Sequence, residues 1–118
     1  MRIMIVDDSR TFREATKLLL KKNPIYKIVA EAENGEVAVE LYKQYIPEMV
    51  LMDIEMPVMN GIEATKVIMR EYKEAKIIAI SAHKEKLYLN EALDAGFSGF
   101  VYKNNMIEQL HDAITFAT

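Results

Sequence analysis

Five short apolar segments divide this 118-residue chain, and each is followed by residues with the apolar spacing of a helix. The segments predicted as strands are residues 3–6, 28–32, 49–53, 77–80 and 100–102. Residues 3–6, 49–52 and 77–80 are unbroken apolar runs, which is typical of a strand buried on both faces. Strands that alternate with helices need a parallel sheet with right-handed crossovers and helices on both faces. The sequence therefore predicts an α/β fold, a flavodoxin-like doubly wound (βα)5 unit with strand order 2-1-3-4-5.

Start and stop signals place the predicted helices. Ser9 can cap the first helix, and Asn60 can cap a helix over residues 61–72 with Glu63 as its capping-box partner. Gly96 ends the fourth helix, and Asn34 with Gly35 forms a turn. Two helices carry predicted core stripes, made of Phe12, Ala15, Leu18 and Leu19 in the first and Met106, Ile107, Leu110 and Ile114 in the last.

Composition excludes several classes of function. The chain has no cysteine, which leaves no disulfide or thiolate chemistry, and its formal net charge is −3. That charge argues against a nucleic-acid surface, since phosphate contacts need clustered lysine and arginine. The apolar stretch 1–6 is too short for a signal peptide or a membrane span. We expect one domain over residues 1–118, cytoplasmic, with no direct nucleic-acid or membrane contact.

Acidic residues follow the two strands that this order places side by side. Asp7 and Asp8 follow the first strand, and Asp53 ends the third. Because the carboxyl ends of parallel strands meet at one edge of the sheet, these carboxylates should lie together, flanked by Ser81 and Lys103 from the fourth and fifth strands.

Such a cluster has a defined chemistry. Crowded carboxylates need a cation or shifted pKa values, and their hard oxygens suit Mg²⁺ with waters and phosphate oxygens. An aspartate can also be a nucleophile that forms an aspartyl-phosphate, for which Asp53 is the candidate. Phosphoryl transfer needs mainly positioning and neutralised charge, which a metal on one side and Lys103 on the other would supply, while the Ser81 hydroxyl donates to a phosphoryl oxygen.

Taken in order, these motifs resemble the receiver domain of two-component response regulators over essentially the whole chain. The matching features all lie at strand ends or in the loop that follows, and they are Asp7-Asp8, Asp53, Pro57…Gly61, Ser81-Ala82, and Phe100 three residues before Lys103. Each motif alone is weak, but five of them in this order form a specific signal.

The resemblance implies the roles at the reacting centre. Asp53 would be the phosphoacceptor, and Asp7 and Asp8 would hold Mg²⁺ (or Mn²⁺), with Asp8 and Asp53 as direct ligands. The backbone carbonyl of Glu55 would be a further ligand, and Lys103 would bind the phosphoryl group. The chain would catalyse its own phosphorylation and dephosphorylation without being a turnover enzyme on an external substrate.

The resemblance also implies partners and a switch. A sensor histidine kinase or phosphotransfer protein would supply the phosphoryl group. Ser81 would be the switch hydroxyl and Phe100 the switch aromatic. The surface of the fourth helix, fifth strand and fifth helix would then meet a downstream effector or a second copy, with Tyr88, Leu89 and Tyr102 offering apolar contacts.

One position departs from the family pattern. Many receivers have a cis proline directly after the lysine, whereas Asn104 follows Lys103 here. A non-proline cis bond costs roughly 2.5–4 kcal/mol, so we expect a trans bond. A polar residue after the lysine occurs in receivers that carry a C-terminal helix-turn-helix output, which leaves open whether this chain is stand-alone or a module.

Other functions fit the same fold less well. A flavin- or nucleotide-binding module would need a phosphate loop after the first strand, where Asp7 and Asp8 repel anions. A receiver-like interaction module without phosphorylation usually lacks an acid or the lysine, and both kinds of residue are present. An aspartate-based phosphatase would want two acids flanking one apolar residue. His83 is expected beside the site, exposed, as a modulator.

Overall fold

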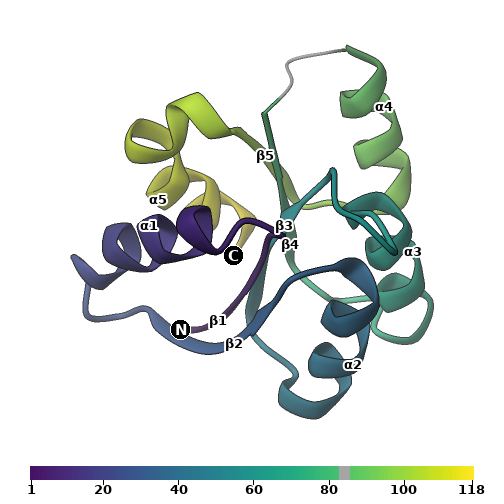
Figure 1. The fold of residues 1–118 in the computed structure, drawn as a ribbon, viewed down its shortest axis with the longest axis horizontal. Coiled ribbons are helices and arrows are strands. Elements are labelled where there is room, and N and C mark those ends of the chain that lie inside the picture. The colour runs from purple at the N-terminus through teal and green to yellow at the C-terminus, as the bar shows by residue number, and fades with distance from the viewer. Residues whose placement is uncertain (83–85) are drawn as a thin grey trace.

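A five-stranded parallel sheet forms the centre of the computed structural model, which describes residues 1–82 and 86–118 and, for residues 86–89, the helical backbone only (Figure 1). The strands are β1 (Arg2–Val6), β2 (Lys27–Ala32), β3 (Met49–Asp53), β4 (Ile77–Ser81) and β5 (Gly99–Tyr102). Their order is β2-β1-β3-β4-β5, and every neighbouring pair is parallel. The predicted flavodoxin-like topology is confirmed, and the strand boundaries agree to within one residue.

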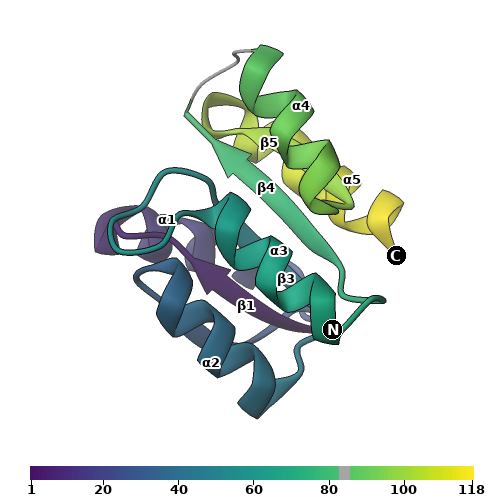
Figure 2. The ribbon, with the colours of Figure 1, turned by 90° about the vertical axis from the view of Figure 1, so that its right-hand side faces the viewer.

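The helices cover both faces of the sheet. They are α1 (Arg10–Lys21), α2 (Gly35–Tyr45), α3 (Gly61–Glu71), α4 (Lys86–Ala95) and α5 (Met106–Ala117), and a 3-10 turn, η1 (Lys103–Asn105), precedes α5. Helices α1 and α5 lie on one face, while α2, α3 and α4 lie on the other (Figures 1 and 2). In the described part of the chain, no helix has the length and apolarity to cross a membrane.

Alternate residues of the central strands enter different cores. In β3, Val50 and Met52 pack into the core under α2, α3 and α4, whereas Met49 and Leu51 pack into the core under α1 and α5. All five residues of this strand are buried. Burial on both faces explains why the segment reads as an unbroken apolar run.

Three side chains cap helices that follow strands of the sheet. Ser9, Asn34 and Asn60 each accept a hydrogen bond from the backbone N–H three residues later, at 3.2, 2.9 and 2.9 Å. The predicted caps at Ser9 and Asn60 are confirmed, and Asn34, expected only as a turn residue, is the cap of α2. Capping satisfies N–H groups at the start of each helix that would otherwise lack partners.

Three residues of the predicted core stripes instead face solvent. Leu18 is 68% exposed, Ile107 is 79% exposed and Ala15 is also exposed, while Leu20 and Met106 are buried. Residues of a helix are about 100° apart, so Ala15 and Leu18 lie on the side of α1 away from Leu20, and Ile107 lies off the arc that Met106 and Leu110 share. The prediction was wrong at these three positions because the sheet covers only a narrow arc of each helix.

Gly61 closes the loop that follows β3. Its N–H donates to the Ile54 carbonyl at 2.8 Å, and a Cβ at this position would lie 2.0 Å from the carbonyl oxygen of Asp53. A side chain cannot fit there without moving the backbone of Asp53. Gly99 differs, because a Cβ there would meet only the Ile78 side chain at 3.6 Å, an ordinary contact.

This difference predicts that alanine substitutions at Gly61 and Gly99 affect stability differently. Gly61→Ala should lower the free energy of unfolding by about 1–3 kcal/mol, because the new methyl group displaces backbone rather than a flexible side chain. Gly99→Ala should leave that free energy unchanged or raise it slightly, since glycine is unfavourable inside a strand. Urea unfolding of both variants measures the effect, and equal stabilities would contradict the close approach at Gly61.

Candidate functional site

Three carboxylates meet at the carboxyl edge of the sheet, as the sequence predicts. Asp7 directly follows β1 and Asp53 ends β3, and these strands are neighbours, with Val6 paired to Met52. One oxygen from each of Asp7, Asp8 and Asp53 lies within 4.8 Å of the other two. Asp7 is only 2% exposed and Asp53 only 4%, whereas Asp8 is exposed.

Lys103 places an ammonium group against two of these acids. Its Nζ lies 2.9 Å from Oδ2 of Asp7 and 3.5 Å from Oδ1 of Asp53. The residue begins the 3-10 turn that follows β5, and its bond to Asn104 is trans, as expected. One cation therefore faces three carboxylates, and the cluster is short of positive charge.

The other contacts of Asp7 fix its orientation. Its Oδ1 accepts a hydrogen bond from the Ser9 N–H at 2.8 Å, and its backbone carbonyl accepts one from Nη1 of Arg13 at 2.6 Å. Oδ2 is buried, and apart from its ion pair with Lys103 no donor in the described residues meets it at hydrogen-bonding angles. A buried carboxylate oxygen without an aligned donor is suited to a small hard cation.

Burial and repulsion shift the ionisation of the site. Burial, followed by the negative charge of Asp7, raises the pKa of Asp53 to about 7; Lys103 opposes this shift and Asp8 adds to it. For Lys103, burial acts to lower the pKa, but the close contact with the Asp7 carboxylate and the charge of Asp53 outweigh it and the net pKa is raised. The ammonium thus stays charged at neutral pH, while Asp53 needs further positive charge to ionise fully.

The remaining predicted residues lie on β4, on β5 and in the loop after β3. Strand register pairs Asp53 with Ile80 and Ser81 with Tyr102, which places Ser81 between the ends of β3 and β5. Ser81 is buried, and Phe100 on β5 is half-buried against the core under α2, α3 and α4. Glu55 is exposed two residues after Asp53. The expectation for His83 lies outside the described residues, as do those for the side chains of Tyr88 and Leu89.

Two residues of α1 join the site although the sequence did not mark them as functional. The guanidinium of Arg13 holds the Asp7 carbonyl and pairs with Glu31 of β2 at 3.2 Å, a contact between residues 18 apart. The ring of Phe12 lies under the Lys103 ammonium, 4.3 Å from Nζ to the ring centroid. The helical spacing of Phe12 predicts a core residue. Its place in the first helical turn after the Asp7–Ser9 loop is the sequence signal that could have indicated its contact with Lys103.

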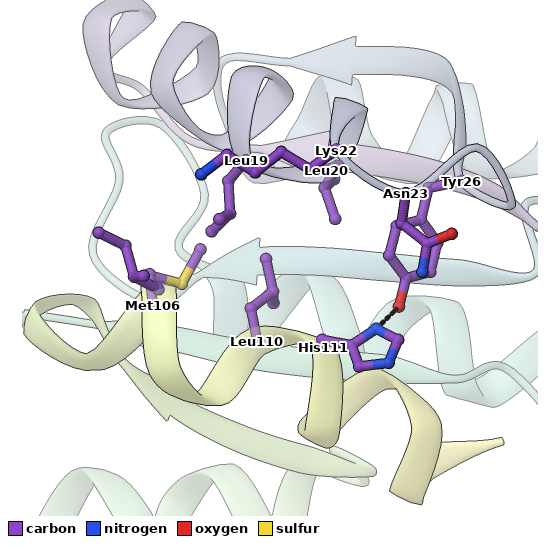
Figure 3. Close-up of a pocket in the computed structure, with 9 residues that line it drawn as sticks. Leu19, Leu20, Lys22, Asn23, Tyr26, Met106, Leu110 and His111 are labelled. Carbon is purple, nitrogen blue, oxygen red and sulfur yellow. Dashed lines mark hydrogen bonds between the residues drawn. The ribbon is translucent and has the colours of Figure 1, made fainter.

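A separate cavity of about 240 Å³ opens between α1 and α5 (Figure 3). Apolar side chains such as Leu19 and Met106 line it, and the Tyr26 hydroxyl hydrogen-bonds Nδ1 of His111 across one end. His111 is exposed, and this contact ties it to the segment before β2. None of the acids lines this cavity, so the carboxylate cluster is a distinct site.

Comparison with known proteins decides the family. Residues 3–115 match the family model described as response regulator receiver domain. The chain belongs to the response regulator receiver family. Its acidic cluster is of the kind typical of magnesium sites in receivers.

Relatives of this receiver include both regulators and chemotaxis proteins. The transcriptional regulatory protein DegU of Brevibacillus brevis is 39% identical over 114 residues, covering 97% of this chain and 48% of DegU. The chemotaxis protein CheY of Bacillus subtilis is 42% identical over 113 residues, covering 96% of this chain and 93% of CheY. The solved structure of a CheX–CheY–BeF₃–Mg²⁺ complex from Borrelia burgdorferi is 28% identical with a TM-score of 0.91, covering 98% of this chain and 87% of that chain.

These lengths separate two groups. The receiver spans about half the length of DegU but nearly all of CheY. The shared unit is therefore the domain with the acidic cluster.

The raised pKa of Asp53 predicts a pH-dependent stability. Its folded value of about 7 lies above the roughly 3.9 of an unfolded aspartate, so folding favours the protonated acid. This contribution is present below about pH 4 and is lost as the pH rises to about 7. Urea unfolding in a metal chelator measures the effect. The stability of Asp53→Asn relative to wild type should rise by on the order of 2–3 kcal/mol as the pH increases from about 5 to about 8. A stability difference that is independent of pH would contradict the prediction, and saturating Mg²⁺ should reduce the difference.

Proposed function

We propose that this receiver accepts a phosphoryl group on Asp53 from a phosphohistidine of a sensor histidine kinase or phosphotransfer protein. A carboxylate oxygen of Asp53 attacks phosphorus, the bond from phosphorus to the histidine nitrogen breaks, and an acyl phosphate forms as the imidazole leaves. Hydrolysis reverses the state: water attacks phosphorus and releases inorganic phosphate and the Asp53 carboxylate. The observation that carries the proposal is a buried carboxylate at the end of β3, with Lys103 3.5 Å away and Asp7 and Asp8 beside it.

Mg²⁺ (or Mn²⁺) is the proposed cofactor. Asp8 and Asp53 would hold it directly, with Asp7 and the backbone carbonyl of Glu55 completing the protein's share of the ligands. When bound, the ion would neutralise charge on the carboxylates and the phosphoryl oxygens. The proximity of the three carboxylates and the buried Oδ2 of Asp7 support this assignment. The Borrelia burgdorferi structure is a complex of CheX and CheY with BeF₃ and Mg²⁺.

Lys103 and Ser81 would bind the transferred group. The Lys103 ammonium already lies against Asp53, so it can pair with a phosphoryl oxygen there. The Ser81 hydroxyl, buried at the end of β4, would donate to another. The protein would thus promote its own phosphorylation and dephosphorylation, in the cytoplasm, without turning over an external substrate.

Asp53→Asn tests the phosphoacceptor. The change keeps the size of the side chain and removes the nucleophilic oxygen, so incubation with acetyl phosphate and Mg²⁺ should give a phosphoryl mass shift in wild type and none in the variant. Asp112→Asn, the same change at an exposed position on α5, should be phosphorylated like wild type. Normal stoichiometry in Asp53→Asn would refute the assignment. A wild-type protein that takes no phosphate would instead favour a receiver-like interaction module.

We further propose that phosphorylation switches the surface of α4, β5 and α5, through which the protein would control a downstream effector or pair with a second copy. The phosphoryl group adds charge and acceptor oxygens beside Ser81 and Lys103. Drawing Ser81 inward would open space next to β4 into which the half-buried ring of Phe100 can turn. A preference of only a few kcal/mol for the active arrangement is enough for phosphorylation to invert the populations of the inactive and active states.

Ser81→Ala should separate phosphorylation from this switch. The variant keeps Asp53 and Lys103, so it should bind beryllofluoride with Mg²⁺, but the amide exchange of residues 84–103 should respond less than in wild type. Ser98→Ala, in the loop before β5, serves as the matched control and should respond normally. A silent 84–103 region in wild type, or a full response in Ser81→Ala, would show that the hydroxyl does not couple to Phe100.

A further inference from the structure

The ring of Phe12 closes one side of the Lys103 ammonium. Nζ lies over the ring, 4.3 Å from its centroid, while Asp7 and Asp53 occupy two other sides at 2.9 and 3.5 Å. A cation within about 6 Å of an aromatic centroid is attracted by the negative face of the ring. The ammonium is therefore held by one aromatic ring as well as by two carboxylates.

Hydrogen bonds fix that ring relative to the acids. The Ser9 N–H donates to Oδ1 of Asp7 at 2.8 Å, and the Ser9 hydroxyl accepts from the Phe12 N–H at 3.2 Å. Thr16 then donates its hydroxyl to the Phe12 carbonyl at 2.9 Å. Ser9 thus links the Asp7 carboxylate to the backbone of Phe12, so the ring and the acid hold one side chain between them.

The ring next to the ammonium matters because a lysine side chain is flexible and its charge is strongly hydrated. Its ammonium is a strongly hydrated point charge on a flexible four-carbon stem, and at an open edge it would turn to water. A ring on that side excludes water and replaces part of the lost hydration with the attraction of its face. Lower local polarity also strengthens the pairs with Asp7 and Asp53.

We infer that Phe12 is a positioning residue that confines the Lys103 ammonium between Asp7 and Asp53. The reactive position of Lys103 then depends on α1 as well as on β5. This inference rests on the proposed function only for its effect on phosphorylation, because the contact between ring and ammonium can be tested without it.

A double-mutant cycle in urea unfolding tests that contact. Phe12→Leu keeps an apolar side chain and removes the ring face, and Lys103→Met keeps the stem and removes the charge. The two changes should couple by about two- to thirty-fold in the unfolding equilibrium constant. Phe12→Leu combined with Lys66→Met, at an exposed lysine of α3 on the opposite face, should be additive.

NMR gives a second readout, and its main observation is made on the wild-type protein. The ε-methylene protons of Lys103 should lie upfield of those of exposed lysines because they sit near the ring face. Phe12→Leu should remove that shift and Phe12→Tyr should retain it. Additive behaviour of Phe12 and Lys103, or a wild-type Lys103 without the upfield shift, overturns the inference.

Kinetics then test the consequence for the site. With acetyl phosphate at saturating Mg²⁺, Phe12→Leu should be phosphorylated about two- to thirty-fold more slowly than wild type, with the same Mg²⁺ affinity, while Phe12→Tyr stays near wild type. Phe12→Leu at the wild-type rate overturns the positioning role while leaving Asp53 as phosphoacceptor. A wild type that takes no phosphate overturns the proposed function, and the cycle and the NMR shift still decide the contact.

Discussion

The ion pairs between Lys103 and the acids are the interaction on which the site depends. Asp7 and Asp53 are almost fully buried, and a buried carboxylate without a partner is costly. Lys103 compensates part of this cost through contacts of 2.9 and 3.5 Å, yet one ammonium cannot balance three carboxylates. Burial, together with this remaining imbalance, raises the pKa of Asp53. A site held in this state gains stability from any added positive charge, which explains why it suits a divalent cation.

The sheet distributes the site between its centre and its edge. Asp7 directly follows β1 and Asp53 ends β3, and both strands are paired on both sides and buried on both faces. Phe100 lies on β5, the strand at one edge of the sheet, and Lys103 directly follows that strand. Central strands resist displacement because two neighbours and two cores hold them, whereas an edge strand has one neighbour. The proposed phosphoacceptor, Asp53, thus lies on the most constrained part of the fold. The residues proposed to report its state lie on or next to the edge strand, which can move with less loss of contact.

Helix α1 links the acids to the rest of the molecule. Ser9 caps the helix and also donates to Asp7, Arg13 holds the Asp7 carbonyl, and Phe12 lies against Lys103. The same helix packs with α5 over one face of the sheet (Figure 1). A change at the α1–α5 face therefore has a short structural route to the ammonium group. A transcriptional regulatory protein and a chemotaxis protein both share this domain. One fold with a common site can therefore occur in proteins of different function.

The sequence alone determined the architecture and the convergence of the acidic cluster with Lys103. Alternation of strand and helix patterns requires a parallel sheet, and parallel strands bring their carboxyl ends to one edge, so Asp7, Asp8, Asp53 and Lys103 had to converge. Helix caps at Ser9 and Asn60 followed from local chemistry within four residues. Only the tertiary structure decided which apolar helix residues face the sheet, since Leu18 and Ile107 fit the spacing but lie outside the covered arc. It alone also placed Phe12 against Lys103 and Arg13 against Glu31, because contacts between distant residues depend on how the helices pack and leave no local pattern in the chain.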